Sequence, residues 1–136
     1  MTISESFVKM LENKGYGVFG QNIFLYRVPN SLKTPTELFY IIPSGGNAVE
    51  IYPSGARVKS YQFLVYFRSN SAKRVDKVLN EMEKDLSCSG CVQFEGYEMV
   101  GINTSLYPAD QDADSENRMV GMIQVQIEVY KTCDES

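Results

Sequence analysis

The chain has 136 residues and a net charge of −4, and 43% of its residues are hydrophobic and 22% are charged. These proportions are ordinary for a globular protein and exclude a disordered chain, and the length suits a single domain over residues 1–136. Net acidity argues against general nucleic-acid binding, and the longest apolar runs, such as 63–67, are too short to span a membrane. The first residues lack the basic and apolar stretches of a signal peptide, so we expect an intracellular protein.

The first predicted element is a helix that begins near Thr2 and ends before Gly15. Thr2 and Glu5 have the spacing of a capping box, which satisfies the first backbone N–H groups of a helix. Apolar residues then recur at helical spacing: Ile3, Phe7, Met10 and Leu11. The segment 14–21 contains three glycines and predicts a tight connector.

Extended segments follow, each bounded by the Pro, Gly, Ser or Asn residues that favour turns. We expect strands at 23–28 and 37–42, and a short extended piece at 49–52. A turn is expected between the last two, at 43–47, where Pro-Ser-Gly-Gly-Asn stands in the sequence. A second turn at 53–55 would make the region 43–59 a hairpin.

The middle of the chain contains a strand and a helix. Residues 60–68 alternate between two faces that are both partly apolar, which predicts a strand near the centre of the sheet. Residues 71–86 are expected to form a helix, because apolar residues recur there at helical spacing. These residues are Ala72, Val75, Val78, Leu79, Met82 and Leu86.

The last part of the chain contains two long extended segments, 97–107 and 118–131. In the second, Ile123, Val125, Ile127 and Val129 alternate with mostly polar residues, which is the clearest strand pattern in the chain. Two helices cannot serve as crossovers for five strands, so most pairings must be antiparallel. The expected fold class is therefore α+β, with a mostly antiparallel sheet of four to five strands and two helices packed on one face.

Residues suited to catalysis or metal binding are scarce. The chain has no histidine, which removes the usual general base near neutral pH and the commonest metal ligand. Cys88 and Cys91 form a Cys-x-x-Cys pair, but a structural zinc needs four ligands and only Cys133 remains as a thiol. The pair also follows a predicted helix, whereas a redox thiolate is stabilised at a helix N-terminus. We therefore expect no catalytic residue, no cofactor and no metal.

Four acidic residues alternate along one predicted loop: Asp110, Asp112, Asp114 and Glu116. The first three match the opening of a calcium-binding loop. However, Ser115 stands where that loop requires Gly, and Gly121 stands where it requires a bidentate Glu. A metal-dependent nuclease or phosphodiesterase would be the alternative use of this loop, although such sites usually collect carboxylates from several elements. The simplest interpretation is an acidic loop in contact with solvent or with a basic partner.

Charge is distributed unevenly along the chain. Residues 1–74 contain nine Lys/Arg and four Asp/Glu, a net charge of +5, whereas residues 75–136 contain four and thirteen, a net charge of −9. Opposite charges on two segments suit head-to-tail contacts between copies, unless the two parts interleave in the fold and the asymmetry disappears. We therefore select the acidic loop and the basic residues Arg57 and Lys59 as candidate subunit or partner contacts.

Three segments together resemble a known family. They are KGYGVFGQNIFLYRVPNS (14–31), IIPSGGN (41–47) and YPADQDADSENRMVGMIQVQIEVYK (107–131). They are similar to the tail-terminator group of long-tailed bacteriophages, which is also called bacteriophage minor capsid protein. The resemblance extends over nearly the whole chain and includes the predicted order of elements.

This resemblance implies a structural virion protein, not an enzyme. Proteins of that family have an α+β fold and form a ring, usually a hexamer, on the tail tube protein, which stops tube growth and presents a surface to the head connector or stopper protein. The implied location is the head–tail interface of the virion, after assembly in the host cytoplasm. Genomic DNA would pass through the lumen without specific binding. A head-completion or connector subunit is the alternative within the same structural class.

Overall fold

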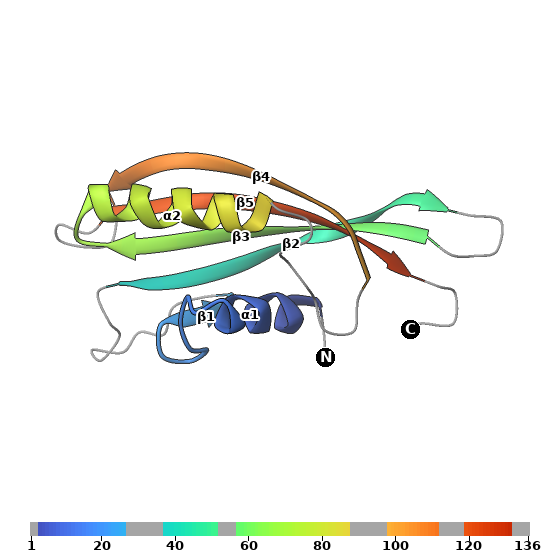
Figure 1. The fold of residues 1–136 in the computed structure, drawn as a ribbon, viewed down its shortest axis with the longest axis horizontal. Helices are drawn as coiled ribbons and strands as arrows, with labels where there is room; N and C mark the ends of the chain where they lie inside the picture. Colours follow the sequence, from blue (N-terminus) through green and yellow to red (C-terminus); the bar gives the residue numbers. More distant parts are fainter. Residues whose placement is uncertain (1–2, 27–36, 52–56, 88–97, 112–118, 132–136) are drawn as a thin grey trace.

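The computed structural model describes residues 3–26, 37–51, 57–87, 98–111 and 119–131. They form α1 (Ile3–Asn13), β1 (Ile23–Leu25), β2 (Leu38–Ile51), β3 (Arg57–Ser69), α2 (Ala72–Ser87), β4 (Glu98–Gln111) and β5 (Met119–Lys131). The strands make one sheet in the order β1-β2-β3-β5-β4 (Figure 1). β1 runs parallel to β2, and the other three pairings are antiparallel. The expected α+β class with a mostly antiparallel sheet is confirmed.

Local hydrogen bonds define the ends of both helices. After α1, Gly15 adopts a φ of 88°, and the N–H of Tyr16 donates to the carbonyl of Leu11 at 3.1 Å. Glycine enters this left-handed conformation without a steric penalty, which accounts for the predicted stop. At the start of α2, the Ser71 hydroxyl accepts a hydrogen bond from the N–H of Arg74 at 3.3 Å. Ser71 is therefore the N-cap of α2.

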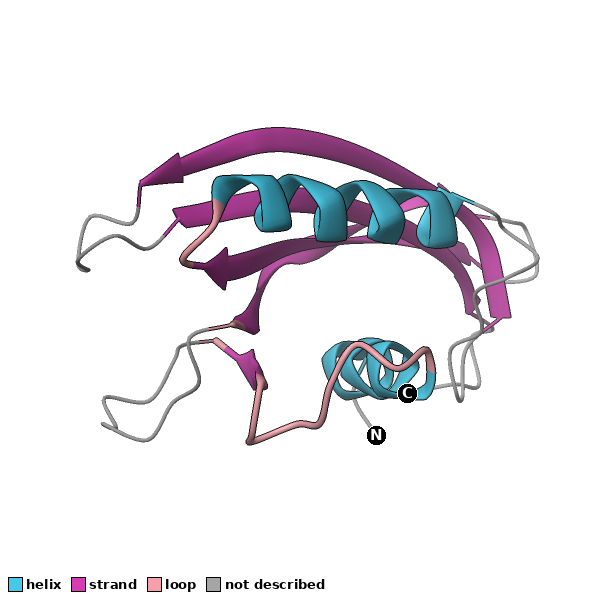
Figure 2. Cartoon of the chain, turned by 60° about the vertical axis from the view of Figure 1, so that its left-hand side comes forward, coloured by secondary structure: helices cyan, strands magenta, loops and turns pink. Residues whose placement is uncertain are grey.

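The core lies between one face of the sheet and both helices. Alternate residues of the long strands point to this face, as the strand period of two requires. On α1, Phe7 stacks on Phe63 of β3 with ring centroids 4.4 Å apart. Figures 1 and 2 show α2 lying along β3, β5 and β4, and α1 beside β1 and β2. The helix residues in this core are Phe7, Val8, Met10, Leu11, Val75, Val78, Leu79, Met82 and Leu86. The prediction that both helices pack on one face is confirmed.

The opposite face of the sheet, which we call the open face, is covered by neither helix. It includes the partly buried side chains Tyr40, Ile42, Gln62, Leu64, Tyr66, Met122, Gln124 and Gln126. Tyr40 and Tyr66 stack across the β2–β3 pair with centroids 4.6 Å apart. The predicted two-sided apolar character of β3 follows from this arrangement, because β3 is the middle strand of the sheet.

The predicted turn at 43–47 is wrong, because these residues lie inside β2. The pairing with β3 shifts between Pro43 and Gly46, where the chain forms an irregularity of the β-bulge type. A bulge accommodates residues that fit a regular ladder poorly without ending the strand. The two short strands expected here, 37–42 and 49–52, are consequently parts of one strand that ends at Ile51.

Two further expectations need correction. The strand predicted at 23–28 ends at Leu25, because Tyr26 adopts a left-handed φ of 75° that leaves the β region. Residues 27 and 28 lie outside the described residues. Ala72, predicted in the buried stripe of α2, is exposed because it occupies the first turn, ahead of the sheet contacts that begin at Val75.

Candidate subunit-interaction surfaces

The structure places Arg57 and Asp110 near opposite ends of the sheet. Arg57 begins β3 and pairs with Lys131, the last residue of β5. Asp110 lies near the end of β4 and pairs with Val120, near the start of β5. Val120 and Lys131 are eleven residue steps apart along β5, a span of about 35 Å in an extended strand. Arg57 and Asp110 are therefore too far apart to contact each other within one subunit.

Only some of these side chains fall within the described structure. Lys59 is partly buried, and its Nζ lies 5.3 Å from the ring centroid of Tyr61, in cation–π geometry. Asp112, Asp114 and Glu116 lie outside the described residues, and so do Cys88 and Cys91. For Arg57 and Asp110, the structure describes only their positions in the strands. Their roles as contacts remain predictions.

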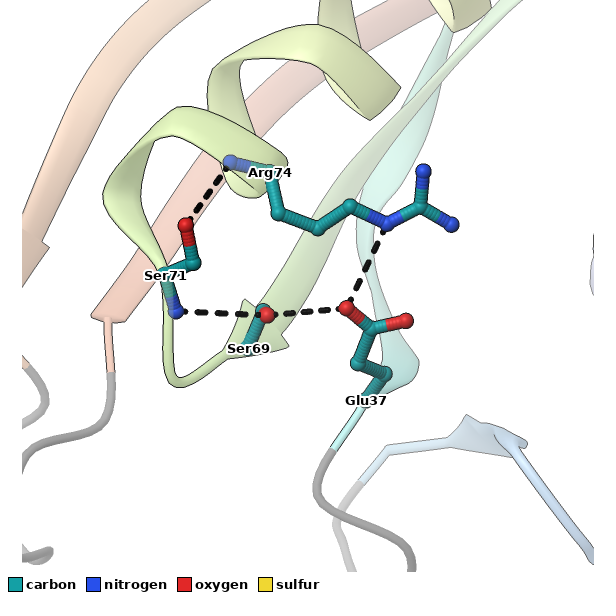
Figure 3. Close-up of polar contacts among 4 residues, drawn as sticks. All are labelled: Glu37, Ser69, Ser71 and Arg74. Carbon is teal, nitrogen blue, oxygen red and sulfur yellow. Dashed lines mark hydrogen bonds and ion pairs between the residues drawn. The ribbon is translucent and has the colours of Figure 1, made fainter.

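A polar network that the sequence did not reveal connects β2, β3 and α2 (Figure 3). Oε2 of Glu37 lies 3.3 Å from Nε of Arg74 and accepts a hydrogen bond from the Ser69 hydroxyl at 2.9 Å. The Ser69 hydroxyl also accepts from the N–H of Ser71 at 3.4 Å. The two charged side chains are 44% and 48% exposed, so this ion pair contributes at most about 1 kcal/mol to stability. The network fixes the start of α2 against the sheet.

A hollow of about 320 Å³ opens beside this network. Its polar lining includes Tyr16, Asn22, Glu37, Arg74 and Glu81, and its apolar lining includes Leu38, Phe39, Phe67 and Val78. Among the described residues, its lining contains no cysteine and no serine.

Tyr16 joins the two helices at one wall of this hollow. Its hydroxyl donates to Oδ2 of Asp85 on α2, while its ring meets that of Phe39 edge-on at 5.8 Å. Burial raises the pKa of the Tyr16 hydroxyl well above its usual range, and the hydrogen bond to Asp85 and the Asp85 charge raise the pKa further. Tyr16 is therefore a protonated hydrogen-bond donor at neutral pH.

Large exposed apolar side chains mark two places on the described surface. Three of them, Val18, Phe19 and Tyr26, flank β1 at one edge of the sheet, and the fourth, Tyr107, lies on β4 at the other edge. The side chain of Tyr26 is 64% exposed, and its backbone has the left-handed φ of 75°. Edge positions follow from strand order, which single-sequence patterns do not contain.

The described residues provide no site for a metal or a membrane. Among them, no three acidic or cysteine side chains are close enough together to hold a metal ion. Neither α1 nor α2 is long and apolar enough to cross a membrane.

Comparison with known proteins agrees with this picture. A model of the family described as bacteriophage tail terminator protein matches residues 10–131. The match includes all five strands, α2 and the end of α1. No curated protein matches the chain. Because the match covers most of the sequence and the whole sheet, the chain belongs to the bacteriophage tail terminator protein family.

Proposed function

We propose that this protein is a tail-completion subunit that closes into a ring on the end of the phage tail tube. The ring, expected to be a hexamer, stops addition of tail tube protein and offers its other side to the head connector or stopper protein. The observation that carries the proposal is the family match over residues 10–131. The protein then works by binding and capping, as a structural part of the virion, and not as an enzyme.

The surfaces described above support a ring made by head-to-tail contacts. A closed ring needs two different patches, one on each side of every subunit. The exposed apolar side chains lie at the two opposite edges of one sheet, at β1 and at β4. Arg57 and Asp110 also lie near opposite ends of this sheet, so a contact between them would join different subunits.

The net charge supports passage of DNA through the proposed ring. The chain carries a charge of −4, so a ring of several copies is strongly acidic. A polyanion experiences repulsion from acidic walls, which favours sliding over sticking. We therefore propose that genomic DNA crosses the lumen without a specific binding site.

The proposal is tested by growth of tail tubes from purified tail tube protein. Adding the wild-type chain should arrest elongation, so tube lengths measured by electron microscopy should stop increasing. Tubes that lengthen equally with and without the chain would contradict the proposal. Cleavage of DNA in the presence of Mg²⁺, abolished by changing Asp112 and Asp114 to Asn, would instead support the nuclease alternative.

The charged segments are tested in the same assay. Reversing Asp110, Asp112 and Asp114 to Lys should leave the subunit folded and weaken capping, and the loss should vary with salt, because exposed ion pairs are screened. Adding Arg57→Glu and Lys59→Glu should restore part of the activity if the two segments meet across a subunit boundary. Unchanged capping by the triple reversal at low and high salt would reject this contact.

A further inference from the structure

The sheet ends at β4, a strand of 14 residues with one partner, β5. No backbone hydrogen bond to its outer edge comes from any of the residues that the structure describes. A strand edge carries a row of N–H and C=O groups that can pair with another chain. The direction in which each group of β4 points therefore decides what this edge can bind.

The directions follow from the alternation of hydrogen bonding in the sheet. The N–H of Phe39 donates to the Asn22 carbonyl, and the N–H of Tyr26 donates to the Ile41 carbonyl, both at 2.8 Å. The backbone N–H and C=O groups of odd-numbered residues in this part of β2 therefore point to β1, and those of even-numbered residues point to β3. In antiparallel strands, hydrogen-bonded residue pairs alternate with non-hydrogen-bonded pairs. The direction of the backbone groups in one strand therefore determines their direction in the next strand.

The transmission uses the registers of the three antiparallel pairs. Tyr40 pairs with Tyr66, so even-numbered residues of β3 bond to β2 and odd-numbered ones bond to β5. Even-numbered residues of β5 then bond to β4, and Gln124 pairs with Ser105. The N–H and C=O groups of odd-numbered residues of β4 consequently form hydrogen bonds with β5 within the subunit. The outward N–H and C=O groups belong to Ile102, Thr104 and Leu106.

Within the part of the chain that the structure describes, this stretch of the edge carries no charge, no proline and no bulge. Pairing with β5 is regular from Gly101 to Tyr107, and the register shifts lie just outside it. Residues 102–107 contain no charge and no proline. Natural proteins blunt exposed edges with charges, prolines or bulges to prevent unwanted pairing. A regular, uncharged edge of six residues is therefore suited to a specific strand partner.

The other side of the sheet offers the matching edge. β1 is closed by its own connector, because Ile23 donates to the Val18 carbonyl and accepts from the N–H of Gly20. Beyond β1, the register of β2 with β3 places Asn47 inward, opposite Ser60, and Gly46 and Ala48 outward. No described residue forms a backbone hydrogen bond with that outward edge of β2. β2 and β4 also run in opposite directions, since three antiparallel steps separate them.

We propose that the outer edge of β4 at 102–106 pairs antiparallel with the outer edge of β2 at 46–48 in the next copy of this chain. Rotation of one copy onto the next, without inversion, brings these two edges together in antiparallel directions and leaves the helices on the same side. Such a heterologous contact repeats until the ring closes. This inference rests on the proposed ring and identifies the contact that builds it.

A proline at an outward position tests the contact without disturbing the ladder inside the subunit. Thr104→Pro removes an N–H that faces away from β5, so the variant should fold but lose the ring peak in size exclusion with light scattering. Thr104→Ala is the matched control, because it removes the hydroxyl that lies 3.5 Å from the Ser87 hydroxyl and keeps the N–H. Rings formed by Thr104→Pro as readily as by the wild type would overturn the proposal.

The reciprocal variant, Ala48→Pro, tests the other edge. It should also remain monomeric when alone. A mixture with Thr104→Pro should give heterodimers, in which the intact β4 edge of Ala48→Pro pairs with the intact β2 edge of Thr104→Pro. Assembly should stop at the dimer, because its two outer edges both carry the proline. Rings or wild-type-like oligomers from Ala48→Pro alone would show that β2 is not the partner edge and would overturn the pairing proposed here.

If the proline variants do not fold, hydrogen exchange of backbone amides in the wild-type chain tests the strand pairing between copies. The amides of Ile102, Thr104 and Leu106 should be protected in the ring and exchange rapidly in the dissociated subunit. The neighbouring amides of Asn103 and Ser105 should be protected in both. Equal exchange of the first three amides in ring and subunit would reject strand pairing while leaving the ring intact, whereas a wild-type chain that forms no ring would contradict the proposed function itself.

Discussion

The clearest energetic prediction concerns Ile127 and its neighbour Gln126 on β5. Ile127 is fully buried and lies between Tyr61 of β3 and Ile102 of β4, on the helix side of the sheet. Ile127→Ala removes three carbon atoms, each worth roughly 0.8 kcal/mol of transfer free energy, or about 2.4 kcal/mol in total. The cavity left behind adds to this, so the expected loss of unfolding free energy is about 2–5 kcal/mol.

The neighbouring substitution Gln126→Ala is the control, since Gln126 belongs to the open face. Its Nε2 donates to the Ser60 hydroxyl at 2.8 Å, and this bond is worth about 0.5–1.5 kcal/mol. Urea unfolding followed by circular dichroism should show a much lower midpoint for Ile127→Ala and a small shift for Gln126→Ala, with unchanged slopes. Equal losses at the two positions would refute the assignment of the strand's faces.

Three further predictions concern single groups. Cys88→Ser with Cys91→Ser should leave ring formation intact and the protein free of zinc, because too few further ligands are available; one zinc per chain by elemental analysis would contradict this. Ser71→Ala should lower the unfolding free energy by about 1 kcal/mol through loss of the α2 N-cap, whereas an unchanged urea midpoint would argue against the cap. The raised pKa of Tyr16 means that the folded state holds this proton more tightly than the unfolded state, so stability should fall as pH rises above the usual tyrosine range. Tyr16→Phe should lose that dependence, and an identical alkaline unfolding profile would refute it.

The elements that the sequence predicted well share a strong periodic pattern. The alternation over 118–131 corresponds to β5, whose apolar residues Ile123 to Val129 are buried at every second position. Helical spacing likewise placed α1 and α2 within one or two residues of their observed ends. These patterns reflect burial against a single core, and burial is the property that residue type records most directly.

The places where a strand is irregular or ends were harder to predict. Pro43, Gly45 and Gly46 read as a turn, yet they lie inside β2, because pairing with β3 outweighs local turn preference and a bulge absorbs the misfit. The end of β1 depends on the left-handed backbone of Tyr26, a conformation that a tyrosine does not signal.

The candidate surfaces depended on strand order, which is a property of the whole fold. Glu37 and Arg74 are 37 residues apart and meet only because β2 and the start of α2 flank the same end of β3. The position of β4 at the edge of the described sheet is equally invisible in the sequence, since an edge strand and an inner strand can carry the same alternation. The charge asymmetry, in contrast, was visible in the sequence, and the structure adds that Arg57 and Asp110 lie near opposite ends of the sheet.

The central claim, that this chain caps tail tubes as a ring, is tested most directly by negative-stain electron microscopy of the purified protein mixed with tail tubes. We predict a ring of uniform size in the protein alone, and a single such ring at one end of each tube, with tubes that no longer grow. Dispersed monomers alone, together with bare tube ends that continue to elongate, would contradict the account.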